Sequence, residues 1–247
     1  MRIVVVGASS GLGRSIGIGL ARRGARVALL ARRHERLVDA ANEAGRDALA
    51  IRCDVTDQSS CAEAVEEAAR SMGGIDALVY ATGVGPLARL VDLDAETWHQ
   101  TFATNVIGAA LVTAAAVPHL TASQGVAAYL SSVSASLTPP WPGLGAYVVS
   151  KAALDKLVEA WRAEHPAVGF TRIVVGDCAG GEGRSRTEFN TGWDVRLAAE
   201  VYPVWHARHY ISGTLLDVDD LVRAVDHVVR LGAGATVTSV TVAPRGS

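Results

Sequence analysis

Residues 3–13 read Ile-Val-Val-Val-Gly-Ala-Ser-Ser-Gly-Leu-Gly, and this stretch decides the fold class. Its first four residues are apolar and β-branched, which predicts a buried strand. The glycines that follow are typical of a tight turn, and a helix is expected to begin directly after it. A strand, a turn and a helix in this order form the first half of a βαβ unit.

The rest of the chain repeats this alternation of short apolar runs and longer helical patterns, which predicts one doubly wound α/β domain with a parallel sheet over residues 1–247. The runs are nearly continuous, so helices should cover both sheet faces in three αβα layers. Residues 177–213 lack clean periodicity, and we interpret them as a substrate lid. Strands are expected at 3–6, 27–31, 48–53, 77–81, 126–131, 171–176 and 236–242, and helices at about 11–23, 34–44, 58–72, 95–120, 146–164 and 217–231.

Composition excludes several classes of protein. Hydrophobic residues make up 49% of the 247 residues and charged residues 19%, which excludes intrinsic disorder. The 23 basic and 25 acidic residues leave a net charge of −2 without a long basic run, so nucleic-acid binding is not expected. The longest near-apolar run, residues 106–118, is shorter than the roughly 18 residues of a membrane span. With no secretory signal pattern at the N-terminus, we expect a cytoplasmic protein without a membrane partner.

The glycine-rich turn predicts a phosphate-binding loop. Gly7 can make the turn off the strand, Gly11 can let the backbone approach a pyrophosphate, and Gly13 can bring helix and strand close together. The helix N-terminus offers free N–H groups to the anion, beside the intervening Ser9, Ser10 and Leu12. A dinucleotide site is therefore expected, although a tight turn without a ligand would use the same glycines.

Two arginines follow the second predicted strand, where an acidic residue would bind ribose hydroxyls and a basic one would bind a 2′-phosphate. Arg32 is placed for a bidentate phosphate contact, with Arg33 in support. This favours NADP(H), with NAD(H) as the other possibility. Alternatively, both arginines only begin the solvated face of the next helix.

Asp54 and Val55 follow the third predicted strand. Their carboxylate and backbone are placed to meet an adenine amino group. The other interpretation is that Asp54 caps the helix that follows, and the sequence leaves both roles open.

Tyr147 and Lys151 are four residues apart, so on a helix they share one face. A nearby ammonium stabilises a phenolate and lowers the pKa of the tyrosine, which suits proton transfer. An incidental surface pair is the alternative interpretation.

Together, the Gly7–Gly13 loop, Asn105, Ser131-Ser132-Val133 and Tyr147-x-x-x-Lys151 resemble the short-chain dehydrogenase/reductase family. The resemblance implies a Rossmann-type fold with seven parallel strands in the order 3-2-1-4-5-6-7, usually in homodimers or homotetramers. It further implies that Tyr147 is the general acid/base, Ser132 holds the substrate oxygen, Lys151 binds the nicotinamide ribose and Asn105 positions a water in the proton relay.

Two departures from the family pattern lie beside the expected cofactor. Tyr80-Ala81-Thr82-Gly83 stands where the family commonly has Asn-Asn-Ala-Gly, so hydrogen bonds of the missing asparagines must be remade, while Ala81, Thr82 and Gly83 remain expected cofactor contacts. Residues 177–183, DCAGGEG, replace the usual Pro-Gly. In the following segment, Thr187 matches the family's nicotinamide-contacting threonine.

A third departure lies between Ser132 and Tyr147, whose separation of 15 residues is about two more than is usual in the family. We interpret this as a loop insertion and keep Ser132, with Ser134 as the alternative.

The remaining candidates have weaker support. His206 and His209 lack a third ligand, so no metal site is expected, and the cysteines Cys53, Cys61 and Cys178 are expected to be reduced thiols. The alanine-rich residues 109–116 fit either an oligomer contact or a buried helix. Aromatic side chains expected to line the substrate pocket, or to seal the lid, are Trp141, Trp193, Tyr202, Trp205 and Tyr210.

The sequence therefore predicts an NADP(H)-dependent oxidoreductase that acts on a small-molecule carbonyl/alcohol pair. The alternative is a dinucleotide-binding sensor or scaffold of the same fold without turnover.

Overall fold

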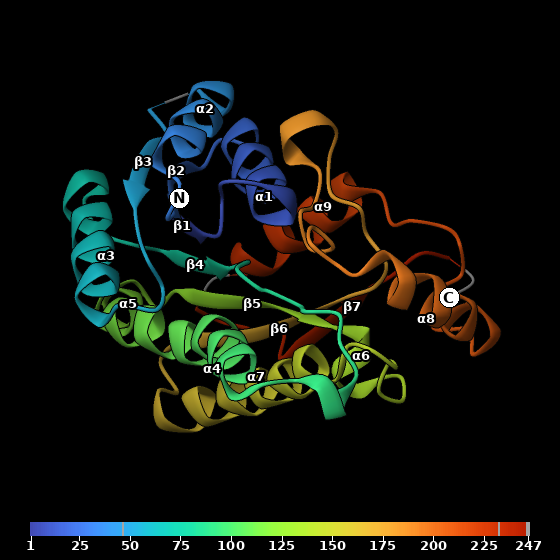
Figure 1. Cartoon of the computed structure of the whole chain (residues 1–247). Helices are drawn as coiled ribbons and strands as arrows, with labels where there is room; N and C mark the ends of the chain where they lie inside the picture. Colours follow the sequence, from blue (N-terminus) through green and yellow to red (C-terminus); the bar gives the residue numbers. More distant parts are fainter. Residues whose placement is uncertain (46, 232, 246–247) are drawn as a thin grey trace.

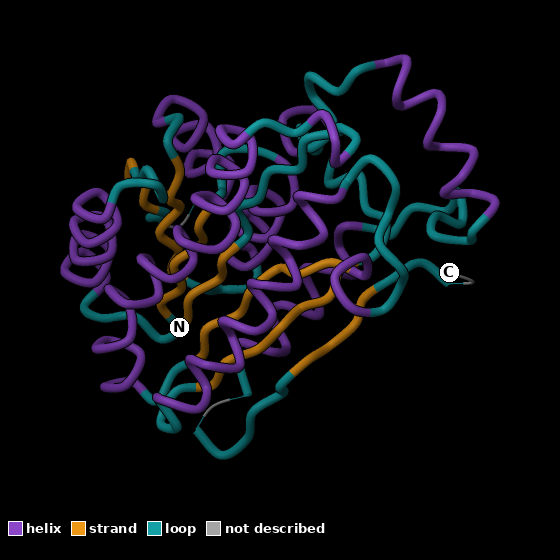
Figure 2. Tube along the Cα trace, turned by 60° about the horizontal axis from the view of Figure 1, so that its bottom comes forward, coloured by secondary structure: helices purple, strands orange, loops and turns teal. Residues whose placement is uncertain are grey.

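Seven parallel strands form one sheet in the order β3-β2-β1-β4-β5-β6-β7 in a computed structural model that describes residues 1–45, 47–231 and 233–245. This confirms the predicted Rossmann-type sheet, and Figure 2 shows the strands side by side. The strands are β1 (Arg2–Val6), β2 (Arg26–Ala31), β3 (Leu49–Arg52), β4 (Ala77–Tyr80), β5 (Val126–Ser132), β6 (Gly169–Val175) and β7 (Ser239–Val242).

Helices cover both faces of this sheet, as the unbroken apolar strands predict. Figure 1 shows α1 and α9 on one side, and α3, α5 and α7 on the other. The helices are α1 (Gly11–Arg22), α2 (His34–Ala44), α3 (Gln58–Met72), α4 (Ala95–Phe102), α5 (Gly108–Ser123), α6 (Val133–Ser136), α7 (Gly145–Glu164), α8 (Val195–Ala207) and α9 (Val218–Val229). Short 3₁₀ turns occupy Leu90–Asp92 and Gly183–Ser185.

Side chains of β1 enter the hydrophobic cores on both faces of the sheet. Ile3 and Val5 belong to the core on the side of α1 and α9, whereas Val4 and Val6 belong to the core on the side of α3 and α5. All four side chains are fully buried because alternate residues of a strand point to opposite faces.

The C-terminal helix α9 packs directly on the N-terminal helix α1. Leu221, Val222 and Val225 share one core with Ile16 and Leu20. The approach is close at Gly19, where an added Cβ would lie 2.5 Å from a methyl group of Val222. The glycine-rich sequence of α1 therefore also serves helix packing.

The predicted helix at 95–120 is a longer element of three parts. A π-helical segment, Ala103–Ile107, joins α4 to α5, so the helical path runs from Ala95 to Ser123. By length and composition alone this path could cross a membrane. Its residues Ala109, Val112 and Ala116 are fully buried in the core with α3, as expected for a core helix of a doubly wound domain.

Part of the predicted irregular lid is helical, because α8 lies inside residues 177–213 (Figure 1). Asp194 caps this helix by accepting hydrogen bonds from the backbone N–H groups of Arg196 and Leu197. Val201 and Trp205, one turn apart, bury its inner face. The cap and this spacing were the sequence signals for a helix, and Pro203 inside it obscured them.

Candidate active site

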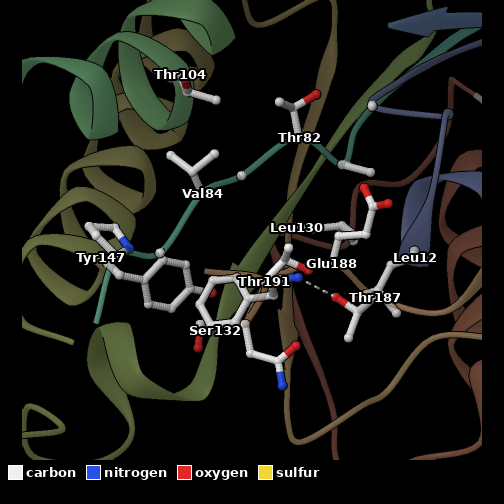
Figure 3. A pocket seen from close by; sticks show the side chains of 18 of the residues that line it. Leu12, Thr82, Val84, Thr104, Leu130, Ser132, Tyr147, Thr187, Glu188 and Thr191 are labelled. Carbon is white, nitrogen blue, oxygen red and sulfur yellow. Dashed lines mark hydrogen bonds between the residues drawn. The ribbon is translucent and has the colours of Figure 1, made fainter. Parts of the chain in front are cut away.

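A cleft of about 1380 Å³ opens along the carboxyl ends of the strands, where β1 and β4 adjoin at the reversal of strand order. The predicted catalytic and cofactor-binding residues all line it, except Asn105, which is fully buried. Figure 3 shows Tyr147 and Ser132 on one side of the cleft, with Leu12, Thr187 and Glu188 on the other. The structure thus brings together residues from distant parts of the chain.

The glycine loop has the geometry expected for close approach of a phosphate. Gly7 has a φ of 89°, in the left-handed region that favours glycine. A Cβ on Gly13 would lie 2.4 Å from the carbonyl oxygen of Gly7, so no larger residue fits there. The loop therefore fits the diphosphate of a dinucleotide, with the first turn of α1 facing the cleft.

Arg33, rather than Arg32, makes the contacts to this loop. Its guanidinium donates hydrogen bonds to the hydroxyls of Ser9 at 3.0 Å and Ser10 at 2.9 Å, and it also donates to Glu188 at 2.7 Å. Arg32 is exposed and lines the same cleft. Both arginines are therefore placed at the end of β2 where the sequence predicts recognition of a 2′-phosphate.

The capping role considered for Asp54 is wrong. Asp57 caps α3 by accepting a hydrogen bond from the backbone N–H of Ser60. The Asp54 carboxylate instead accepts hydrogen bonds from the backbone and hydroxyl of Thr56 and lines the cleft with Val55. Burial alone would raise the pKa of Asp54, but the Thr56 hydrogen bonds and the charge of Arg32 hold it below its usual value.

Tyr80 replaces the first asparagine of the family pattern. Its buried hydroxyl donates a 2.6 Å hydrogen bond to the carbonyl of Thr104, inside the π-helical segment. This bond joins the end of β4 to the α4–α5 path. Ala81, Thr82 and Gly83 line the cleft wall.

Asn105 holds the segment after β4 in place. Its amide oxygen accepts a hydrogen bond from the backbone N–H of Val84, and its amide nitrogen donates to the Val84 carbonyl and to the hydroxyl of Ser150, each at 2.8 Å. The role in positioning a water, which the resemblance implies for Asn105, stays a prediction. A Cβ on neighbouring Gly83 would lie 3.3 Å from the Lys151 ammonium, so Asn105 positions the loop that covers this lysine.

Ser132, Tyr147 and Lys151 meet where β5 ends against α7. The Ser132 hydroxyl lies 2.9 Å from that of Ser134 and forms a hydrogen bond with Tyr147. Lys151 is only 4% exposed, donates a 2.7 Å hydrogen bond to the carbonyl of Leu130, and lies 5.9 Å from the centre of the Tyr147 ring. The contact with Tyr147 favours Ser132 over Ser134 as the serine that faces the phenol.

Burial is the main cause of the pKa shifts of Tyr147 and Lys151. It raises the pKa of Tyr147 to about 12, and the hydrogen bond with Ser132 opposes this shift only in part. It lowers the pKa of Lys151 to about 8. Desolvation therefore sets the direction of the Tyr147 pKa shift, while the Lys151 ammonium gives its hydrogen bond to the carbonyl of Leu130.

The aromatic side chains both seal the lid and line the cleft. Trp205 is 2% exposed and donates a hydrogen bond to the Pro142 carbonyl, while Trp141 stacks on Tyr210. Trp193 donates a hydrogen bond to the carbonyl of Gly85. These contacts fasten α8 to the loop before α7. The cleft wall includes Trp141, Trp193, Tyr202 and Trp205.

Two site residues beside Thr187, and Arg36 on α2, were missed from the sequence. Phe189 lies edge-on to Tyr147, with ring centres 4.8 Å apart. Glu188 pairs with both Arg33 and Arg36. The sequence signal was an acidic residue beside Thr187 and a third arginine after Arg33, but their meeting depends on the tertiary fold.

Comparison with known proteins identifies the family of this chain. The profile of the short chain dehydrogenase family matches residues 1–188. Among curated proteins, 11-beta-hydroxysteroid dehydrogenase A of Sesamum indicum is 33% identical over 180 residues, which are 70% of this chain and 51% of that protein. Cis-4-hydroxycyclohexanecarboxylate dehydrogenase of Sinomonas cyclohexanicum is 32% identical over 171 residues, 68% of each chain. The chain thus spans about half the length of the sesame protein and about two thirds of the bacterial one.

Solved structures show the same likeness over nearly the whole chain. A short-chain type dehydrogenase/reductase from Mycobacterium marinum superposes with a TM-score of 0.83 at 25% identity, covering 98% of this chain and 93% of that one. An alcohol dehydrogenase from Thermococcus sibiricus, complexed with 5-hydroxy-NADP, has a TM-score of 0.79 at 25% identity, covering 97% and 94%. With the family profile matched over most of the chain, and with the glycine loop and Tyr147 in one cleft, this chain belongs to the short-chain dehydrogenase/reductase family.

Proposed function

We propose that the chain is an NADP(H)-dependent oxidoreductase that interconverts a carbonyl and an alcohol. The observation that carries this proposal is the single cleft that joins the glycine loop to Ser132, Tyr147 and Lys151. A dinucleotide along the loop would extend toward these three side chains. When bound, NADP(H) supplies or accepts the hydride.

Residues of the chain would transfer the proton and orient the substrate. Ser132 would donate a hydrogen bond to the substrate oxygen, and Tyr147 would transfer a proton to or from that oxygen. Lys151, beside Gly83, would bind the nicotinamide ribose. Thr187 and the backbone of residues 177–183 would flank the nicotinamide.

An apolar, ring-bearing substrate fits the cleft best. Phe189 lies edge-on to Tyr147, Trp193 contacts Phe189, and Trp205 contacts Trp193. Rings bind well against such aromatic faces. The names of two relatives, a hydroxysteroid dehydrogenase and a hydroxycyclohexanecarboxylate dehydrogenase, specify cyclic alcohols for those proteins. We therefore propose cyclic ketones and secondary alcohols as the first substrates to test.

The preference for NADPH is tested by fluorescence titration of Arg32→Ala and Arg33→Ala with NADPH and NADH. Each substitution is expected to weaken NADPH binding by about 10- to 100-fold, because a charge-assisted hydrogen bond contributes roughly 1.5–3 kcal/mol. Binding of NADH should change little. Arg70→Ala, an exposed arginine of α3 outside the cleft, is the control. Equal affinities for the two cofactors in the wild-type chain would contradict the proposal.

We further propose a homo-oligomer formed through the outer face of the α4–α5 path. Ile107 is 52% exposed there, and the alanines around it permit close approach of a second helix. Ile107→Glu is expected to reduce the mass in solution from a dimer or tetramer to a smaller species, measured by light scattering, because a charge would be buried in an apolar contact. Val38→Glu on α2 is the control, and an unchanged mass for Ile107→Glu would exclude this face.

A further inference from the structure

Glu188 joins the lid to the start of α2, across 155 positions of sequence. Its carboxylate accepts a hydrogen bond from the Arg33 guanidinium at 2.7 Å and pairs with Arg36 as well. The Ser10 hydroxyl also contributes a hydrogen bond. Two guanidinium groups and a hydroxyl at the first turn of α1 therefore converge on one carboxylate.

These donors form the kind of set that binds a phosphate. Guanidinium groups recognise phosphate oxygens through paired hydrogen bonds, and a helix N-terminus favours an anion. Arg33 is one of the two arginines at which the 2′-phosphate of NADP(H) is expected from the sequence, and it also donates a hydrogen bond to the Ser10 hydroxyl. Hydrogen bonds from Arg36 and Arg33 lower the pKa of Glu188 to about 2, so the carboxylate is charged at neutral pH.

The residues on either side of Glu188 lie against the glycine loop and against Tyr147. Thr187 lies over the glycine loop, where a Cβ on Gly11 would be 3.4 Å from its Cα. Phe189 fills the space between Gly85 and Tyr147, since a Cβ on Gly85 would lie 2.2 Å from its ring. The ion pairs of Glu188 therefore also keep Thr187 over the glycine loop and the Phe189 ring against the Tyr147 phenol.

We propose that Glu188 is a specificity-determining latch, a carboxylate that occupies the binding site of the 2′-phosphate. A cofactor that carries this phosphate displaces Glu188 from Arg33, Arg36 and Ser10, and this displacement releases the lid. The proposal rests on the proposed preference for NADP(H), and it assigns that preference to the lid as well as to the arginines. A phosphate carries about −1.5 to −2 charge at neutral pH and three acceptor oxygens, so it competes well with a single carboxylate. The uncharged ribose hydroxyls of NADH do not compete with the carboxylate for these donors.

The latch is weak enough to be displaced. The Glu188 side chain is 39% exposed and its two arginine partners are 44% and 47% exposed, so solvent screens the pairing. A second ion pair, Arg184 with Asp39, ties the same lid segment to α2 and uses none of the phosphate donors. Displacement of Glu188 is therefore expected to loosen residues 186–192 first.

Hydrogen exchange tests the latch without turnover. Adenosine 2′-monophosphate, which carries only the 2′-phosphate, is expected to raise backbone amide exchange in residues 186–192 of the wild-type chain, whereas adenosine is not. Glu188→Gln should show the raised exchange without any ligand and should bind adenosine 2′-monophosphate about three- to tenfold more tightly, with adenosine binding unchanged. Glu182→Gln, an exposed carboxylate of the same segment, should behave as the wild type.

The two possible failures are distinguishable. If adenosine 2′-monophosphate binds the wild type more tightly than adenosine, yet exchange in residues 186–192 is the same with and without it, or the same in Glu188→Gln, the latch is wrong and the cofactor preference stands. If adenosine 2′-monophosphate binds no more tightly than adenosine to either chain, and NADPH no more tightly than NADH, the cofactor preference itself is wrong and the latch fails with it.

Discussion

Tyr147→Phe is expected to lower kcat/KM for a cyclic ketone by about 10²- to 10⁴-fold, which is the usual contribution of a positioned general acid. The substitution removes only the hydroxyl that forms a hydrogen bond with Ser132. The ring remains against Phe189, so folding and NADPH affinity should be unchanged. Initial rates followed by the absorbance of the reduced nicotinamide, together with a binding titration, check both halves of the prediction.

Tyr210→Phe is the matched control, because Tyr210 stacks on Trp141 and its side chain does not line the described cleft. It should retain the wild-type rate. Full activity of Tyr147→Phe would remove this tyrosine from the reaction. If the wild-type chain binds NADPH tightly and turns over no carbonyl or alcohol, the oxidoreductase proposal is contradicted.

Gly13→Ala is expected to damage both folding and cofactor binding, because the new Cβ would lie 2.4 Å from the Gly7 carbonyl oxygen and 2.8 Å from its carbon. Both atoms belong to the backbone, so the loop itself must shift. Overpacking of this kind costs about 1–3 kcal/mol, which in a chain of this size lowers the Tm by roughly 3–10 °C. A loop displaced from α1 should also weaken NADPH binding.

Thermal unfolding with and without NADPH measures both effects. Gly234→Ala is the control, since a Cβ there meets no described atom within 4 Å and the residue does not have a positive φ. A Tm of Gly13→Ala equal to that of the wild type, with the same rise on adding NADPH, would show that the loop tolerates the added methyl group.

The parts of the site that follow from local sequence could be predicted. Gly7 and Gly13 flank a strand-to-helix turn, and Tyr147 and Lys151 share a helix face because four residues make about one turn. In each case the geometry depends on a few neighbouring residues. The sheet order also followed once the chain resembled a family with a known order.

The parts that depend on distant contacts could not be predicted. The sequence favoured Arg32, but Arg33 reaches the loop because its side chain meets Ser9, Ser10 and a lid residue 155 positions away. The pKa of Tyr147 depends on how many groups exclude water from the phenol, which spacing along a helix does not reveal. The π-helical segment around Asn105 likewise accepts a hydrogen bond from Tyr80, which lies on another element.

The packing of α9 on α1 has a consequence for how the protein is made. The phosphate-binding turn is synthesised before α9, so Ile16 and Leu20 of α1 can pack on Leu221 and Val222 only after those residues have been synthesised. Until then the first βαβ unit exposes an uncovered hydrophobic surface. The nascent chain therefore carries its cofactor loop on an incomplete core until α9 has been synthesised, and chaperones that bind exposed apolar segments should recognise it during that interval.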